Sequence, residues 1–143
     1  MYTTIEILTK KKFFPWFSNI SLDIKICDSL ELLEPNKKKF LISYNTNIII
    51  PKSVFSRFKI AINIHPGLYS FPGRDPHHWA CYKKAKFYGA TAHILSEKVD
   101  QGTIIDFEKE EVKKFSPLYY HRIANKCSKI LLKRVFERIT NNT

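Results

Sequence analysis

Glycine is scarce in this chain of 143 residues: there are four, and all of them lie between Gly67 and Gly102. A phosphate-binding loop of the GxGxxG or GxxxxGK type places several glycines after the first strand of a nucleotide-binding domain. The segment before Gly67 cannot supply such a loop, which excludes the NAD-binding and P-loop classes. The glycines that are present place the tight turns and the loops suited to ligands in the region from Asn63 to Asp106.

Cysteines and long apolar runs are also few. Cys27, Cys81 and Cys127 lie far apart and form no CxxC pair. The start of the chain shows no charged region followed by an apolar run and a cleavage site. The apolar runs, such as Ile48 to Ile50, are only a few residues long, whereas a membrane span needs about 20. These absences predict a reduced cytoplasmic protein that does not enter a membrane.

Acidic residues are outnumbered, with 13 Asp and Glu against 24 Lys and Arg, which gives a formal charge of +11. This excess favours anionic partners such as phosphates, nucleotides, folates or nucleic acid. The basic residues are scattered as short runs, however, and we interpret them first as a solvated surface. With 44% hydrophobic residues, the chain suits one compact domain over residues 1–143.

Six short runs rich in β-branched or aromatic residues predict strands. They are TIEIL (from Thr4 or just before it), LDIKIC (from Leu22), KFLISY (from Lys39), IAINI (from Ile60), ATAHIL (from Ala90) and TIIDF (from Thr103). Prolines suited to a first helical turn open the segments PKSVFSRF and PHHWACYKKA. A long amphipathic helix is expected from Ser116 as cap and Pro117 as first turn, with one apolar and one basic face. The alternation predicts an α/β fold with a mainly parallel sheet, flanking helices and a long C-terminal helix.

The stretch INIHPG carries the best candidate for chemistry, because a buried strand ends there in polar residues. Asn63 and His65 are two apart and therefore project from the same face, just before Pro66 and Gly67 end the strand. Ligands bind at this carboxyl edge in open α/β sheets. An amide can donate to a developing oxyanion while an imidazole handles a proton. From spacing alone, a structural role for His65 remains the alternative.

Several other side chains invite a functional interpretation. Adjacent His77 and His78 would face different ways on a helix, and no cysteine or carboxylate completes a ligand set, so we expect no metal site. His93 shares a strand face with Thr91, where both either support the site or pack in the core. Trp79 and its neighbour Tyr82 are interpreted as packing residues, with stacking on a ligand as the alternative.

The segments INIHPGLYSFPGRDPHHWA and GATAHILSEKVDQGTII resemble the core of the folate-dependent formyltransferases, which include glycinamide ribonucleotide, methionyl-tRNA and sugar-nucleotide formyltransferases. The family pattern is a strand ending in Asn-x-His, a loop with a glycine turn, then Gly-x-Thr-x-His and an Asp followed closely by Gly. The matching positions here are Asn63, His65, Pro66, Gly73, Gly89, Thr91, His93, Asp100 and Gly102. The resemblance covers residues 39–135.

The resemblance implies a Rossmann-like formyltransferase fold and transfer of a formyl group from 10-formyltetrahydrofolate to the amine of a small substrate. Asn63, His65 and Asp100 would be catalytic: the first two would steady the oxyanion, and Asp100 would hold His65 or a proton-relaying water. The folate would lie against two segments and one apolar side chain. These are the main chain of Asn47, Ile48, Ile49 and Ile50, the loop from Leu95 through Val99 to Asp100, and Val54.

The loop GRDPHHW is similar to that of sugar-nucleotide members, which points to a nucleotide-linked amino sugar recognised by Gly67, Arg74 and Trp79. The sequence also departs from the family. Its first 38 residues lack the glycine-containing front loop, and the carboxyl-terminal domain of tRNA-directed members is missing, so nucleic acid is not expected. A degenerate folate- or nucleotide-binding module remains an alternative, as does formylation of glycinamide ribonucleotide or methionyl-tRNA. The sequence leaves open whether a homodimer forms.

Overall fold

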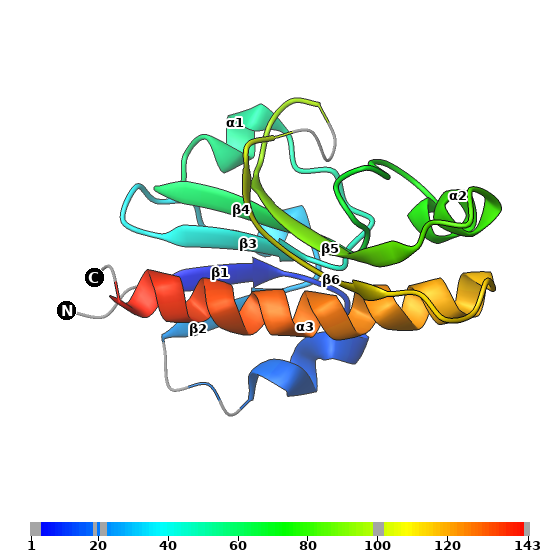
Figure 1. The fold of residues 1–143 in the computed structure, drawn as a ribbon. Helices are drawn as coiled ribbons and strands as arrows, with labels where there is room; N and C mark the ends of the chain where they lie inside the picture. Colours follow the sequence, from blue (N-terminus) through cyan, green and yellow to red (C-terminus); the bar gives the residue numbers. More distant parts are fainter. Residues whose placement is uncertain (1–3, 19, 21–22, 99–101, 142–143) are drawn as a thin grey trace.

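A computed structural model describes residues 4–18, 20, 23–98 and 102–141. These residues include six strands in one sheet (Figure 1). The strands are β1 (Ile5–Leu8), β2 (Ile24–Cys27), β3 (Phe40–Tyr44), β4 (Ile60–His65), β5 (Phe87–Ile94) and β6 (Ile104–Glu111). Each of the six predicted strands is confirmed, although β5 and β6 are longer than their apolar runs suggested.

The order of the strands is β2-β1-β3-β4-β5-β6. Strands β1 to β4 pair in parallel, and β5 is antiparallel to both β4 and β6. The predicted mainly parallel α/β fold is therefore confirmed, with β5 as the strand that runs the other way. Because the parallel strands β1, β3 and β4 end at one edge, the polar residues that follow them are brought together there.

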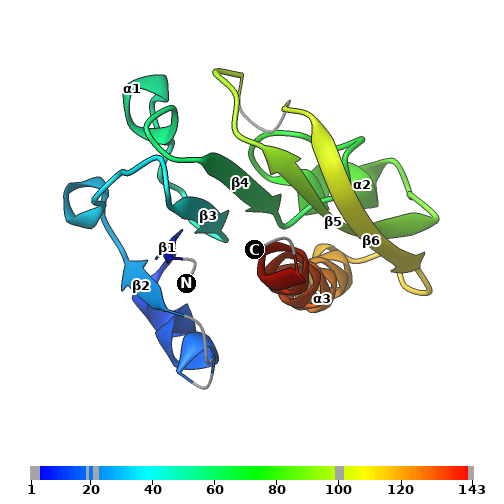
Figure 2. The ribbon, with the colours of Figure 1, turned by 90° about the vertical axis from the view of Figure 1, so that its left-hand side faces the viewer.

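Helices and short turns cover both faces of the sheet. They are α1 (Lys52–Phe55), α2 (Pro76–Tyr82), α3 (Pro117–Asn141) and the 3-10 helices η1 (Lys11–Phe17) and η2 (Leu30–Leu32). The predicted cap of α3 is confirmed, since the Tyr119 amide donates to Ser116 Oγ at 3.3 Å. Figure 1 and Figure 2 show α3 running along one face of the sheet, while α1 lies near the opposite face. No helix in the described ranges is long and apolar enough to span a membrane.

The strand residues divide between two cores according to the period of two. Ile62 and Ile64 join the larger core under α3 and η1, whereas Ala61 joins the smaller core on the other face. Asn63 and His65 alternate with Ile62 and Ile64, so they project from the face that carries the smaller core. The sheet therefore turns its main apolar face towards α3 and its polar strand ends the opposite way.

Trp79 and Tyr82 correct one prediction, because they do not pack. Their side chains are 55% and 80% exposed. Only Pro76 and Ala80, which are four residues apart on α2, are buried in this helix. Because this short helix contacts the rest of the protein through one narrow face, the rings of Trp79 and Tyr82 lie outside that face and remain exposed.

Sequence reasoning missed η1, which brings an aromatic cluster onto the end of β3. The fully buried ring of Tyr44 meets Phe13, Trp16 and Phe17 at centroid distances of 5.7, 6.0 and 6.1 Å, each edge-on. Its hydroxyl has no hydrogen-bond partner within the described part of the chain, and burial raises the pKa of Tyr44. The cluster is therefore held by apolar and ring contacts, at the expense of one desolvated hydroxyl.

Replacing Tyr44 with phenylalanine tests this description of the cluster. A buried hydroxyl without a partner costs about 1–3 kcal/mol, so Tyr44→Phe should leave the free energy of unfolding unchanged or raise it by up to about 1 kcal/mol. Tyr44→Ala should lower it by about 3–5 kcal/mol through lost packing. Urea denaturation of the three proteins measures both changes. A clear loss of stability in Tyr44→Phe would mean that the hydroxyl does have a partner.

Candidate active site

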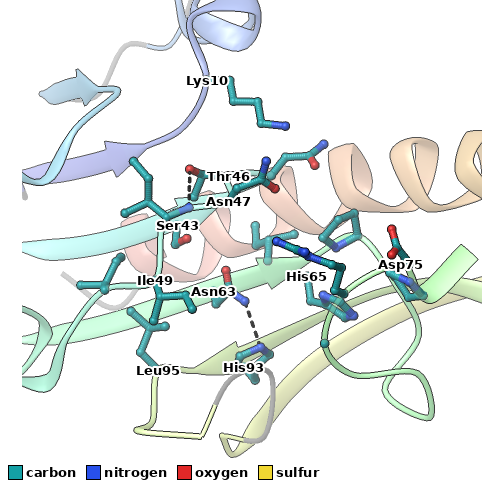
Figure 3. Close-up of a pocket in the computed structure, with 18 of the residues that line it drawn as sticks. Lys10, Ser43, Thr46, Asn47, Ile49, Asn63, His65, Asp75, His93 and Leu95 are labelled. Atoms are coloured by element: carbon teal, nitrogen blue, oxygen red, sulfur yellow. Dashed lines mark hydrogen bonds between the residues drawn. The ribbon is translucent and has the colours of Figure 1, made fainter.

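A pocket of about 670 Å³ opens at the carboxyl ends of β3 and β4 (Figure 3). The segments after β1, β3 and β4 all contribute, as the parallel topology requires. The described lining residues are Lys10, Ser43, residues 45–50, residues 63–66, residues 73–77, His93, Leu95, Ser96, Lys98 and His121. The pocket therefore gathers residues from both halves of the chain.

Asn63 lies in this pocket with a defined orientation. In the antiparallel pairing of β4 and β5 it stands directly opposite His93. Its Nδ2 donates to His93 Nε2 at 3.1 Å (Figure 3), and His93 Nδ1 lies 3.2 Å from the Ile94 carbonyl oxygen. An imidazole that donates through Nδ1 accepts through Nε2, so the two bonds agree on one tautomer. Of the two interpretations of His93, the supporting one fits the geometry: its ring is 2% exposed and positions the Asn63 amide.

His65 lies on the same face of β4 and is 5% exposed. Its Nε2 is 3.0 Å from the carbonyl oxygen of Phe71, to which it donates. Gly67 lies directly beside the ring, since a Cβ at that position would be 2.7 Å from His65 Nε2. Thr91 holds the Gly67 carbonyl with a 3.0 Å hydrogen bond. Gly67 is thus buried next to the imidazole, and the absence of a side chain there leaves room for the ring.

One end of the pocket is apolar and open. Ile49 is 69% exposed although it lines the cavity, and Leu95 lies near it on the same side in Figure 3. The turn that carries Ile49 is shaped by the Ile48 amide, which donates to Thr46 Oγ1 at 3.2 Å. An exposed isoleucine in a concave wall favours a flat, partly apolar ligand.

The sequence-predicted site residues divide into three groups. Asn47, Ile48, Ile49, Ile50, Asn63, His65, Arg74 and Leu95 line the pocket. Val54, Gly67 and Trp79 are described but are not among the lining residues; Val54 packs against the smaller core, and Trp79 contacts Tyr82. Asp100 and Val99 lie outside the described residues, so their predicted roles remain predictions.

Sequence reasoning missed several polar lining residues, among them Lys10, Asp75, His77 and His121. Asp75 has a positive φ of 55°, a conformation in which aspartate is more common than most residues, and directly precedes Pro76. Of these two features, the sequence shows the Asp-Pro pair, which could have marked Asp75 as a turn residue. Lys10 and His121 carry no local signal, because only the folded sheet and α3 bring the two ends of the chain to the same pocket.

The fold and the pocket define an α/β protein with an amide and an imidazole at the carboxyl edge of parallel strands. The sequence of residues 26–135 matches the formyl transferase family. This match spans well over half of the chain, and the protein belongs to this family.

Two curated relatives match over shorter segments. The formyltetrahydrofolate deformylase of Escherichia coli strain K12 is 31% identical over 84 residues, which are 58% of this chain and 29% of the relative. The formyltetrahydrofolate deformylase of Synechocystis sp. is 43% identical over 51 residues, which are 35% of this chain and 18% of the relative. The match thus spans less than a third of the length of either relative.

Two solved structures resemble the whole chain. A 4-N formyltransferase from Francisella tularensis has a TM-score of 0.74 at 22% identity and covers 99% of this chain and 70% of its own. An N-formyltransferase from Helicobacter canadensis, solved with folinic acid and dTDP-3-aminofucose, has a TM-score of 0.78 at 15% identity and covers 100% and 65%. At these identities the likeness shows the fold. It includes the first 38 residues, which supply β1 and β2 to the same sheet.

Proposed function

We propose that this protein transfers a formyl group from 10-formyltetrahydrofolate to the primary amine of a small acceptor, and that the acceptor is a nucleotide-linked amino sugar. The observation that carries the proposal is the pair Asn63 and His65, held on one strand face at the edge of a pocket with an apolar end. Membership in the formyl transferase family supports the reaction class.

The residues present fit a folate. Ile49 and Leu95 offer an apolar surface for a flat heterocyclic ring, and the irregular backbone of residues 45–50 offers N–H and C=O groups for its polar edges. The Helicobacter canadensis relative was solved with folinic acid, a reduced folate. When bound, the folate supplies the formyl carbon that the acceptor amine attacks.

Asn63 and His65 would act on that carbon from the sheet side. The Asn63 amide, which is oriented by its hydrogen bond to His93, would stabilise the negative charge that develops on the formyl oxygen. His65 would move the proton that the amine loses as its bond to the formyl carbon forms. The same proton would be delivered, through His65 or a water, to the folate nitrogen whose bond to the formyl carbon breaks. Asp100, placed here only by the family pattern, would orient His65 or a relaying water.

Basic residues support an acceptor that carries phosphate. Arg74 and Lys10 line the same pocket as Asn63 and His65, and both side chains are basic. We propose that the loop from Gly73 to Trp79 recognises a sugar nucleotide. This proposal is based on the basic charge and on the similarity of the loop to that of sugar-directed members.

Replacing Arg74 with alanine should raise KM for the acceptor and leave kcat nearly unchanged. A lost charge-assisted hydrogen bond of about 1.5–3 kcal/mol corresponds to roughly a 10- to 150-fold rise in KM. Arg57→Ala is the control, because this exposed arginine is not part of the described lining. Steady-state kinetics with varied acceptor decide the point. An equal KM for the two variants would remove Arg74 from the acceptor site.

A panel of acceptors tests the function as a whole. The purified chain is mixed with 10-formyltetrahydrofolate, and release of tetrahydrofolate is followed with amino-sugar nucleotides, glycinamide ribonucleotide and methionyl-tRNA. Amine-dependent release with an amino-sugar nucleotide is the expected result. Activity only with the tRNA would refute the sugar acceptor, and folate binding without any release would favour a non-catalytic binding module.

Hydrolysis is the second candidate, because both curated relatives described above are formyltetrahydrofolate deformylases. Water would then take the place of the amine at the same carbon, with Asn63 and His65 in the same positions. The same assay separates the two reactions. Release of formate and tetrahydrofolate without any amine identifies hydrolysis, whereas an N-formylated acceptor identifies transfer.

A further inference from the structure

Two histidines outside the Asn63 and His65 pair meet in the pocket. His77 lies in the first turn of α2, and His121 lies in the second turn of α3. Their rings contact edge to face, with centroids 4.8 Å apart and planes at 79°. Both line the pocket. The proposed reaction at Asn63 does not use either of them.

Hydrogen bonds hold both histidine rings. His77 Nδ1 lies 2.8 Å from the Tyr88 hydroxyl, with which it shares a hydrogen bond. Asn125 Nδ2 donates to His121 Nε2 at 3.1 Å, which leaves the proton on Nδ1. The Asn125 amide is itself oriented by Asn45, whose Nδ2 lies 3.4 Å from Asn125 Oδ1. The neutral His121 ring is therefore left with one N–H donor, and both rings lie in the wall of the pocket.

The surroundings of these rings are mainly basic. Burial, followed by the charges of Lys12 and Lys10, lowers the pKa of His121. Burial, followed by neighbouring histidines, lowers the pKa of His77 to about 4. The described groups that act on the two rings or share their pocket come from the segment after β1, from β4, from β5, and from α2 with the loop before it. They are Lys10, Lys12, His65, Tyr88, Arg74 and Asp75, and the exposed His78 acts on its neighbour His77.

The positive charge of this part of the pocket is suited to binding an anion. Among the described residues, Lys10, Lys12 and Arg74 outnumber the carboxylate of Asp75, and the imidazole rings of His77 and His121 lie in the same pocket. We propose that His121 and His77, together with Lys10, form a subsite for a dianionic phosphoryl group of the acceptor, and that binding there takes up a proton. This inference rests on the proposed function, for which it names the residues that recognise phosphate.

The proton uptake follows from the charges. In the free protein, burial and, after it, the charges of Lys12 and Lys10 lower the pKa of His121 from its usual value of about 6.5. A bound dianion offsets the lysines and favours the imidazolium, which raises the pKa of His121. Between the lower and the higher value, the complex holds more protons than the free protein. Affinity for the anion should therefore rise as the pH falls through that window.

Sulfate is a suitable probe, because it stays dianionic at neutral and mildly acidic pH and its own titration does not interfere. Sulfate binding is followed through the imidazole NMR signals of the five histidines in the full chain. The test compares the unaltered protein with His121→Gln and with His78→Gln. His121 and His78 are both exposed, so both variants should fold, and His78 is not among the described lining residues.

The unaltered protein and His78→Gln should bind sulfate about fivefold more tightly at about pH 6 than at about pH 8. His121→Gln should lose this pH dependence and bind sulfate about tenfold more weakly at the lower pH. Equal affinity and equal pH dependence in the two variants would overturn the subsite. So would an imidazole signal of His121 that sulfate does not move.

The sulfate test is independent of turnover. If sulfate binds as expected but no acceptor is formylated, the subsite stands and the proposed function fails. If an amino-sugar nucleotide is formylated and His121→Gln leaves both sulfate binding and acceptor KM unchanged, the function stands and the subsite fails.

Discussion

Asn63→Ala is expected to lower kcat by about 10²- to 10³-fold, the usual cost of removing one donor to a developing oxyanion. The affinity for a reduced folate should change little, because the folate surface proposed above consists of residues 45–50 and Leu95, which line the pocket. Single-turnover kinetics measure the first effect, and calorimetry with a folate measures the second. The separation matters because it assigns Asn63 to the transition state and not to binding.

Asn47→Ala is the matched control for Asn63→Ala. It removes an exposed amide from the same pocket, but one whose predicted contact to the folate is through the main chain. Its kcat should stay within about threefold of the unaltered protein, as for a typical exposed position. Comparable losses of kcat in the two variants, or loss of folate binding in Asn63→Ala, would contradict the role given to Asn63.

His65→Gln should lower kcat by about 10²- to 10⁴-fold, the range for a lost proton-transfer group. Glutamine is chosen because its amide N–H can still donate to the Phe71 carbonyl, which accepts from His65 Nε2 at 3.0 Å. The loop and the fold should therefore be retained while the titratable ring is removed. Rapid quench of the formyl transfer, with thermal unfolding beside it, reports the two properties.

His78→Gln controls for the loss of a histidine as such, since His78 is exposed on α2. It should retain full activity. A His65→Gln protein that turns over at a normal rate would exclude proton transfer by His65. One that unfolds or no longer binds a folate would show that His65 is needed for structure, which is the alternative interpretation of a histidine at a strand end.

The sequence predicted those parts of the fold that depend on local patterns. Each strand has a β-branched or aromatic run, and Ser116 with Pro117 is a helix start in its own right. Asn63 and His65 could be paired because the period of two in a strand is a local property. The antiparallel direction of β5 and the short helix η1 were not predicted, because neither follows from the pattern of its own segment.

The remaining site residues depend on contacts between distant segments. Lys10 reaches the pocket because β1 is a central strand, and His121 reaches it because α3 packs across β5. The resemblance to the formyl transferase family identified the strand end but said nothing of these two. Trp79 shows the opposite error: an aromatic residue in a helical segment suggested packing, yet the short α2 leaves it exposed.

The direct pairing of Asn63 with His93 across β4 and β5 also bears on how the acceptor site can change. The chain between these strands, residues 66–86, carries Arg74, Asp75 and His77, while its two ends are fixed by the sheet. A loop whose ends are anchored in this way can be lengthened, shortened or exchanged at modest entropic cost. The amide and its supporting imidazole would keep their register. Under the proposed function, the part of acceptor recognition that belongs to Arg74 could therefore vary with this loop, provided that the loop still places a carbonyl oxygen against His65 as Phe71 does.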